Sequence, residues 1–313
     1  MKKALAIFTA AMMLISAFSV AVAAEGEVPS PIAVYNFEDD GNLGKDVSGN
    51  KNSLSAKGTV NQTNGKYGKA ASFNYEGALV ASSDANGADF IDKIELSGSK
   101  QMTLMYWVKY SKADLESWNT EWGWRRIVSN GVDGSTGYGG FTMLGLVGDN
   151  IIVPSKINPA CIFHTEKAQS WSGGNWSTYP WTEDWVHVAW TVDLGTNPGR
   201  CLFYVNGTAI FDLSEKDISN GLVNLSRAFA IGANYFVDGE SNEQFNQPFA
   251  GEIDDFYAFD KVLDADQIAY YMNNNYTVPE EPSVPTSDAL TAVMPVAVVC
   301  AAAVIVLKKK ILG

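Results

Sequence analysis

Two groups of oxygen-bearing side chains are candidate metal ligands. Residues 38–50 are dense in acid, amide and hydroxyl groups, beginning with Glu38 and including Asp46. Far along the chain, Asp254 and Asp255 are adjacent in a segment that reads as a strand, where two charges are costly to bury unless something neutralises them. Calcium takes about six to eight hard oxygen ligands of these kinds. The alternative is an ordinary polar turn, with aspartates that accept hydrogen bonds from backbone amides.

Aromatic residues are concentrated in two stretches that lack the alternation of a strand. An indole has a flat apolar face and a polar edge, which suits stacking on the C–H face of a sugar while neighbouring Asn and Asp side chains take the hydroxyls. These stretches therefore predict carbohydrate-binding loops, and the alternative is that individual rings only cover the core. The candidate ligand-contacting residues are Trp118, Trp122, Trp124, Trp171, Trp176, Tyr179 and Trp181.

No complete catalytic set can be assembled from the sequence. The two histidines, His164 and His187, are far apart and lack a metal-ligand spacing. No Gly-x-Ser-x-Gly elbow and no phosphate-cradling glycine loop is present. The sequence therefore favours a protein that is not an enzyme.

Both ends of the chain read as export and anchoring segments. Residues 1–24 have the charged, apolar and small-residue order of a secretory signal peptide. Residues 289–307 are an uncharged run long enough to span a bilayer, and the basic tail 308–313 would lie in the cytoplasm. The Pro-rich acidic stretch 277–288 predicts an extended stalk. Stalk, span and tail together resemble the cell-wall sorting signals of Gram-positive surface proteins.

The sorting-signal resemblance is incomplete, because Val284-Pro285-Thr286-Ser287-Asp288 departs from the usual Leu-Pro-x-Thr-Gly. Retention in the membrane is the favoured expectation, and covalent attachment to the cell wall by a sortase is the alternative. Either way, the sequence predicts an extracellular domain held at the cell envelope.

The exported part is strongly acidic. Five of the 22 basic residues lie in the leader and the tail, and none of the 35 acidic residues do, so 17 basic residues remain against 35 acidic ones, a net charge of −18. Such a surface repels phosphate backbones, so nucleic acid is not an expected partner. Cations and neutral ligands suit it better.

The cysteines do not form a disulfide framework. Cys300 falls in the apolar span, which leaves Cys161 and Cys201 in the exported part. Two alternatives follow for this pair: one disulfide bond between them, or two small buried apolar side chains.

Residues 31–276 read as one all-β domain, since they contain no linker and no clear repeat. Asn206-Gly207 suits a tight hairpin turn between two strands. Trp107, Trp185 and Trp190 are expected in the core. Many short strands with Gly- and Asn-rich turns imply a two-sheet sandwich. Strands are expected at residues 32–37, 70–73, 102–110, 141–146, 186–192, 201–205, 208–213, 229–231 and 251–259.

One short helix is expected near the end of this domain. Asp264 can cap its first turn, and Gln267 can complete a capping box. Ile268, Tyr271 and Met272 then form one apolar face. The helix is expected to close one end of the sandwich.

Six short motifs in order give the domain a family resemblance to the laminin-G-like, or concanavalin A-like, jelly-roll domains. Together they cover nearly the whole exported domain. They are Phe37-Glu38-Asp39 with Asp46-Val47-Ser48-Gly49-Asn50, then Gly65-Lys66-Tyr67-Gly68, Met102-Thr103-Leu104, Trp185-Val186-His187, Tyr204-Val205-Asn206-Gly207 and Phe249-Ala250-Gly251-Glu252-Ile253-Asp254-Asp255.

The resemblance implies a structural calcium between the first turn and the last strand, held by Glu38, Asp46, Asp254 and Asp255. It also implies a comparison with jelly-roll glucanases, whose glutamate-x-aspartate-x-x-glutamate strand carries the nucleophile and the acid. Here the strand begins Glu252-Ile253-Asp254, but Tyr257 takes the position of the second glutamate. The mechanism of those glucanases is therefore not expected.

The sequence as a whole predicts a non-catalytic recognition module at the cell surface, which binds a glycan or glycoprotein through its Trp-rich loops and uses calcium as structural support. A protein-binding or purely structural surface component is the alternative, because laminin-G-like domains also bind proteins. A glycoside hydrolase is the least favoured reading.

Overall fold

The computed structural model of the chain describes most of residues 28–276. The chain divides into two compact units, Met1–Tyr276 and Thr277–Gly313, and the second lies outside the described residues together with the leader 1–24. The predictions for signal peptide, stalk, span and tail thus fall outside them. Among the described residues, no helix is long and apolar enough to cross a membrane. The described residues are 28–81, 101–110, 125–129, 140–146, 156–157, 160–165, 168–173, 179–180, 184–193, 195–196, 199–212, 229–237, 242–246 and 248–276.

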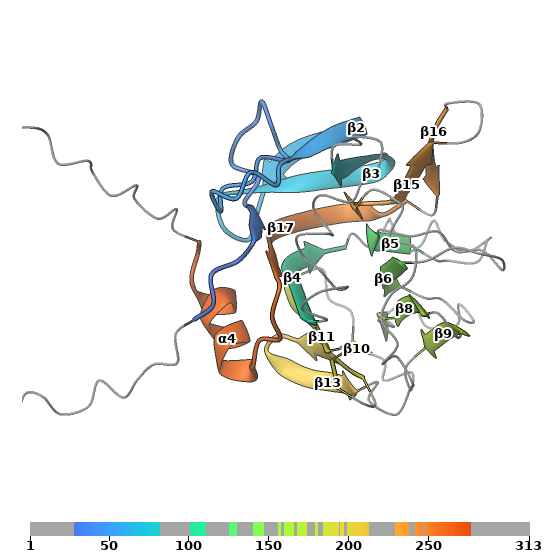
Figure 1. Ribbon diagram of the computed structural model, residues 1–313. Coiled ribbons are helices and arrows are strands. Elements are labelled where there is room, and N and C mark those ends of the chain that lie inside the picture. Colours follow the sequence, from blue (N-terminus) through green and yellow to red (C-terminus); the bar gives the residue numbers. More distant parts are fainter. Residues whose placement is uncertain are drawn as a thin grey trace, which may run out of the picture. The chain divides into compact units, whose positions relative to one another are not determined.

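Antiparallel strands make up nearly all of the regular structure, as expected (Figure 1). The strands are β1 (Ala33–Tyr35), β2 (Leu54–Asn64), β3 (Lys69–Ala81), β4 (Gln101–Lys109), β5 (Arg125–Ser129), β6 (Gly140–Leu146), β7 (Lys156–Ile157), β8 (Ala160–Thr165), β9 (Ala168–Gly173), β10 (Tyr179–Pro180), β11 (Val186–Asp193), β12 (Arg200–Val205), β13 (Thr208–Asp212), β14 (Ala230–Ile231), β15 (Asn234–Val237), β16 (Glu243–Asn246) and β17 (Ala250–Phe259).

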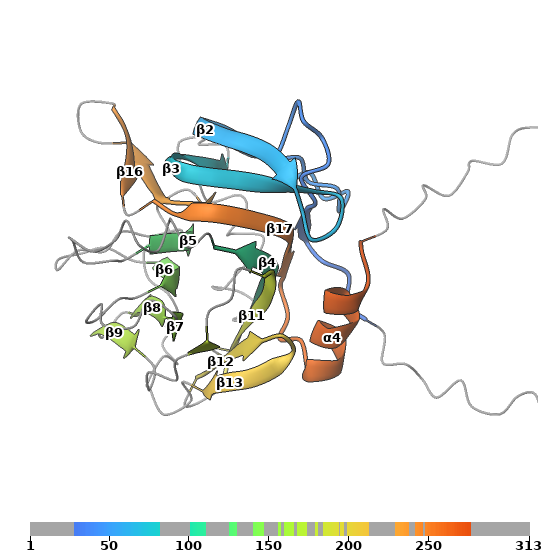
Figure 2. The same cartoon turned by 180° about the vertical axis from the view of Figure 1, so that it is seen from behind.

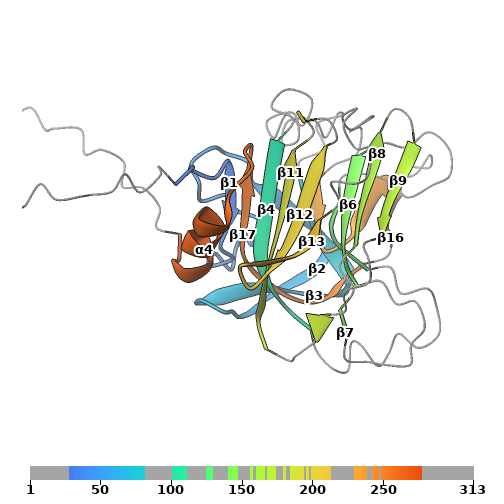
Figure 3. The same cartoon turned by 90° about the horizontal axis from the view of Figure 1, so that it is seen from below.

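One hydrogen-bonded path joins most of these strands. Its order is β13-β12-β11-β4-β17-β3-β14-β5-β6-β8-β9, with β1 paired to β17 and β2 to β3, while β7 pairs β10 and β15 pairs β16. The path turns over at the long strand β3, which pairs with β17 through residues 71–74 and with β14 through residues 79–80. The strands from β13 to β17 and those from β14 to β9 thereby form two layers, which Figure 3 shows as separate groups.

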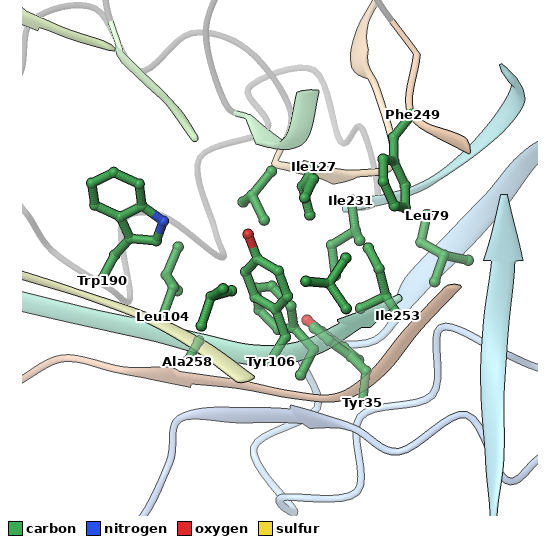
Figure 4. Close-up of a cluster of buried hydrophobic side chains, with 14 of the residues drawn as sticks. Tyr35, Leu79, Leu104, Tyr106, Ile127, Trp190, Ile231, Phe249, Ile253 and Ala258 are labelled. Atoms are coloured by element: carbon green, nitrogen blue, oxygen red, sulfur yellow. The ribbon is translucent and has the colours of Figure 1, made fainter. Parts of the chain in front are cut away.

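A single hydrophobic core fills the space between the two layers (Figure 4). Leu104, Trp190 and Ile253 reach it from β4, β11 and β17, while Ile127 and Ile231 reach it from β5 and β14. Because side chains alternate along a strand, the even-numbered positions of β4 and β11 enter this core. The prediction that Trp190 lies in the core is confirmed, since its exposed fraction is 1%.

The predicted hairpin turn at Asn206-Gly207 is confirmed. Asn206 and Gly207 have positive φ angles of 47° and 77°, as a tight turn between β12 and β13 requires. Strand β2, in contrast, was not predicted. It is an edge strand with mostly exposed polar side chains, so it lacks the apolar alternation that marks a half-buried strand.

The helix α4 (Ala265–Asn273) begins with the predicted capping box. The Gln267 backbone N–H donates to Asp264 Oδ1 at 2.9 Å, and the Asp264 backbone N–H donates to Gln267 Oε1 at 3.0 Å. Ile268 and Tyr271 are buried in a second cluster with Met105, Ala189 and Tyr257. The helix therefore covers the outer face of β4, β11 and β17, on the side away from β8 and β9 (Figure 2).

Cys201 is not part of a disulfide bond in the structure. Cys201 is fully buried on β12 and is a free thiol, so it behaves as the small apolar side chain of the second alternative. The backbone of Cys161 lies in β8.

Candidate functional site

Three predicted acidic ligands, Glu38, Asp254 and Asp255, lie close to the turn between β2 and β3. The β17 ladder shifts register between Asp254 and Tyr257, and Asp255 takes a left-handed φ of 43° there. This bulge inserts an extra residue, so that both aspartates are buried at one point of the strand.

The backbone of the β2–β3 turn lies directly against these carboxylates. The Tyr67 N–H donates to Asp254 Oδ2 at 2.8 Å, and the Lys69 N–H donates to Glu38 Oε1 at 2.9 Å. Such a close approach needs glycine: a Cβ atom at Gly65 would lie 2.5 Å from Asp254 Oδ2, and one at Gly68 would collide with Glu38 Oε1. This explains the motif Gly65-Lys66-Tyr67-Gly68 physically.

The acidic group is electrostatically uncompensated. Burial, and then the charge of Asp255, raises the pKa of Asp254 from 3.8 to about 8. Burial, and then the charge of Glu38, raises the pKa of Asp255 to about 7. Within the described part of the chain, neither aspartate forms an ion pair with a lysine or arginine. Two buried carboxylates beside a third are chemically suited to a hard cation, although no three acidic, histidine or cysteine side chains among the described residues are arranged to hold a metal by themselves.

Asp46, the fourth predicted ligand, has its own set of partners. Its Oδ1 accepts hydrogen bonds from the backbone N–H groups of Val34 and Ser48, and its Oδ2 accepts one from Asn52. The Asn52 side chain in turn donates to the Ile32 carbonyl at 2.6 Å. Asp46 thus organises the first turn through backbone amides, whereas Glu38, Asp254 and Asp255 form the uncompensated group.

The predicted aromatic ligand contacts fall mainly outside the described residues. Trp118, Trp122, Trp124, Trp176 and Trp181 lie there, and for Trp171 and Tyr179 only the backbone is described. Trp171 lies in β9, opposite Ile162 of β8, and Tyr179 lies in β10. The expectation that this stretch lacks strands is therefore wrong for these two positions. The prediction of sugar contacts remains a prediction.

The strand that resembles the catalytic strand of glucanases carries different chemistry. The bulge places Glu252 and Tyr257 on the same, outer face of β17, since Ile253, Phe256 and Ala258 enter the core. Glu252 is paired with Lys109, with Oε2 and Nζ 3.0 Å apart. Tyr257 is buried under α4, 5.2 Å from the Tyr271 ring, and burial raises the pKa of its phenol, which therefore stays protonated.

The outer face also holds two tryptophans that were predicted to be in the core. Trp107 is buried, but it packs against His187 with ring centroids 5.2 Å apart, and the Lys66 ammonium lies 4.5 Å from its ring. Trp185 is only half-buried, and its ring lies 5.7 Å from Lys109 Nζ. The core prediction for Trp185 is therefore wrong. Lys109 was not selected from the sequence, because no pattern marks a lysine at the end of an apolar strand as a partner for Glu252.

These features define a concanavalin A-like jelly-roll sandwich. The chain belongs to the concanavalin A-like lectin/glucanases superfamily, which matches residues 82–269. No curated protein matches the chain significantly.

Several solved structures are similar to this chain, among them the following three. The binding domain of botulinum neurotoxin serotype C1 has a TM-score of 0.52 at 16% identity, and that of botulinum neurotoxin DC in complex with SialylT has 0.51 at 15%; each comparison covers 79% of this chain and 52% of the other. This chain thus spans about half the length of these two structures, which show the fold. Domain 4 of AbnA, an arabinanase of Geobacillus stearothermophilus, in complex with arabinotriose, has a TM-score of 0.49 at 20% identity over 77% of this chain and 97% of its own.

Proposed function

We propose that this protein is a glycan-recognition module without catalytic activity. The observation that carries the proposal concerns strand β17, because the family contains both lectins and glucanases. In this chain the strand that corresponds to the catalytic strand of glucanases holds Glu252 in an ion pair. A buried phenol, Tyr257, stands in place of the second carboxylate. Retaining hydrolysis needs two carboxyl groups about 5–5.5 Å apart. Tyr257 does not replace one of them, since it carries a phenol instead of a carboxyl group and is buried under α4, away from solvent.

The proposed binding surface combines the outer face with the predicted aromatic loops. The exported part carries a net charge of −18, which suits neutral glycans better than phosphate polymers. Trp122 and Trp176 remain the proposed stacking residues of the loops. Stacking of a sugar ring on an aromatic side chain adds to the binding free energy without requiring a particular pattern of hydroxyl groups. The aromatic loops would therefore strengthen binding, and polar groups elsewhere on the surface would select the sugar.

A glycan array probed with the purified protein tests this function. We expect binding to a defined set of glycans, weakened in Trp122→Ala and Trp176→Ala. Absence of binding to every glycan would refute the proposal. A partner captured from envelope extracts that resists glycosidase treatment would favour protein recognition instead.

We further propose that calcium binds at Glu38, Asp254 and Asp255 as a structural ion. The support is electrostatic: burial, and then the charge of a neighbouring carboxylate, raises the pKa values of both aspartates, and a bound cation would offset both effects. A bound calcium would hold both in the ionised form and would fix the β2–β3 turn against β17. Since a ligand that binds only the folded state stabilises it, chelation is expected to lower the melting temperature by several degrees, and an unchanged melt in chelator would refute the site.

The proposed place of action is outside the cell. The predicted signal peptide 1–24 and the predicted span 289–307 support display on a stalk at the cell envelope. Protease treatment of intact cells should then remove the domain. Full protection of the domain in intact cells, with cleavage only after lysis, would contradict surface display.

A further inference from the structure

A surface pocket opens where three strands distant in the sequence meet. It lies over β3, β4 and β17, and its volume is about 290 Å³. Ligand pockets commonly measure about 300–1,000 Å³, so this one is at the size of a single small ring. The lining residues used below are Ser72, Asn74, Tyr75, Lys109 and Glu252.

The charged groups of the pocket are held in fixed positions. Lys109 Nζ lies 3.0 Å from Glu252 Oε2 and 5.7 Å from the Trp185 ring centroid, so an ion pair and a cation–π contact act on the same ammonium. Only 25% of the Glu252 side chain is exposed. A half-buried, mutually neutral couple of donor and acceptor at the pocket wall is suited to two adjacent hydroxyl groups.

The rest of the wall is both polar and aromatic. Ser72 and Asn74 add a hydroxyl and an amide, and Tyr75 adds a half-buried ring. Tyr75 is held at a φ of 73°, a region that non-glycine residues seldom adopt, while its N–H donates to the Phe249 carbonyl at 3.2 Å. Such strain persists only where the surroundings fix the residue, and it is concentrated at binding sites.

We propose that this pocket binds one neutral, hydroxyl-rich sugar ring of a larger glycan. The inference rests on the proposed glycan recognition and adds the position and charge class of one subsite. An anionic sugar would have to approach Glu252 or separate it from Lys109, and a cationic one would meet Lys109. A neutral ring can accept from Lys109 and donate to Glu252 while the pair stays intact.

The test compares variants of the Lys109–Glu252 pair with variants of the Lys57–Glu243 pair, which lies outside the pocket lining. Each variant is probed on a glycan array that carries neutral gluco-, galacto- and manno-oligosaccharides beside sialylated and uronate-containing glycans. The full chain is used, in a detergent without a sugar headgroup. Glu252→Gln keeps the shape of the side chain, and Lys109→Met keeps its apolar stem against Trp185. The control variants Glu243→Gln and Lys57→Met disrupt another ion pair, whose atoms are 2.6 Å apart.

We expect the wild type to bind neutral glycans, each pocket variant to bind them at least about tenfold more weakly, and the control variants to bind as the wild type does. Unfolding curves of all variants show whether each is folded. If the wild type binds neutral glycans and both folded pocket variants bind them equally well, the pocket is not the sugar site. The proposal of glycan recognition would then still stand. Binding only to anionic glycans would also overturn the pocket, and no binding at all would overturn both proposals.

Discussion

Replacing Asp255 with asparagine is expected to stabilise the calcium-free protein at high pH. Asp255 is 6% exposed, next to the fully buried Asp254. Asparagine has nearly the same shape and tolerates the left-handed φ of 43° at this position, so the substitution removes a charge without adding backbone strain. It also removes the charge that raises the pKa of Asp254.

The magnitude follows from the pKa of Asp255. Well below pH 3.8 the carboxyl group is protonated in both the folded and the unfolded chain, so its ionisation does not change the free energy of unfolding. As the pH rises, the unfolded chain loses its proton first, so the free energy of unfolding falls until the pH passes the folded-state pKa of about 7. A rise in pKa from 3.8 to about 7 corresponds to a loss of up to about 4 kcal/mol.

Urea unfolding in chelator, followed by tryptophan fluorescence, measures this difference. At about pH 3 the wild type and Asp255→Asn should have nearly equal stability, and near pH 9 the variant should be more stable by up to about 4 kcal/mol. The exposed Asp40→Asn serves as the matched control. In calcium at the same high pH, the wild type should regain stability and the variant should gain less. A variant that is no more stable than the wild type near pH 9 in chelator would refute the electrostatic reasoning.

The same unfolding assay checks three further substitutions. Trp190→Ala removes a ring that is 1% exposed in the core and should cost about 3–5 kcal/mol, whereas a loss below about 1 kcal/mol would contradict its core position. Asp264→Ala removes the acceptor of the α4 capping box and should cost about 1 kcal/mol, while Asp266→Ala, an exposed first-turn position, should cost less. Asp46→Ala leaves three backbone N–H groups without their acceptor and should cost roughly 3 kcal/mol, equally in calcium and in chelator. A loss seen only in calcium would instead make Asp46 a metal ligand.

Local chemistry made much of the fold predictable. The alternation of residues 186–192 gave β11, because one side of that strand enters the core and the other faces α4. Asn206-Gly207 gave the hairpin turn, and Asp264 with Gln267 gave the start of the helix, because each depends on neighbouring residues alone. Family motifs in sequence order then gave the jelly roll, which the match to residues 82–269 confirms.

The missed elements are those whose stability comes from distant partners. Strand β2 is polar and exposed, and its long pairing with β3 holds it in the sheet. Strand β9 was read partly as loop, because Ser and Gly interrupt its apolar pattern. Trp185 was misplaced because its position just before β11 leaves it beside Lys109 rather than within the core.

The acidic group could be predicted in part, and the pocket could not. Asp254 and Asp255 were found because two adjacent charges in a strand are unusual, and the structure adds the turn that Gly65 and Gly68 bring against them. The pocket depends on residues 72–75, 109 and 251–252, which only the antiparallel ladder of β3, β17 and β4 brings together. The spacing of these residues in the sequence does not predict that they lie side by side.

Calorimetric titration with the neutral oligosaccharide that gives the strongest array signal tests the central claim most directly, because heat flow separates binding from turnover. Recognition without catalysis predicts injection heats that saturate, with a baseline that returns to its starting level after each injection. A sustained displacement of the baseline would reveal continuous hydrolysis, and the absence of any saturable heat would show that the protein does not recognise the sugar; either result would contradict the account.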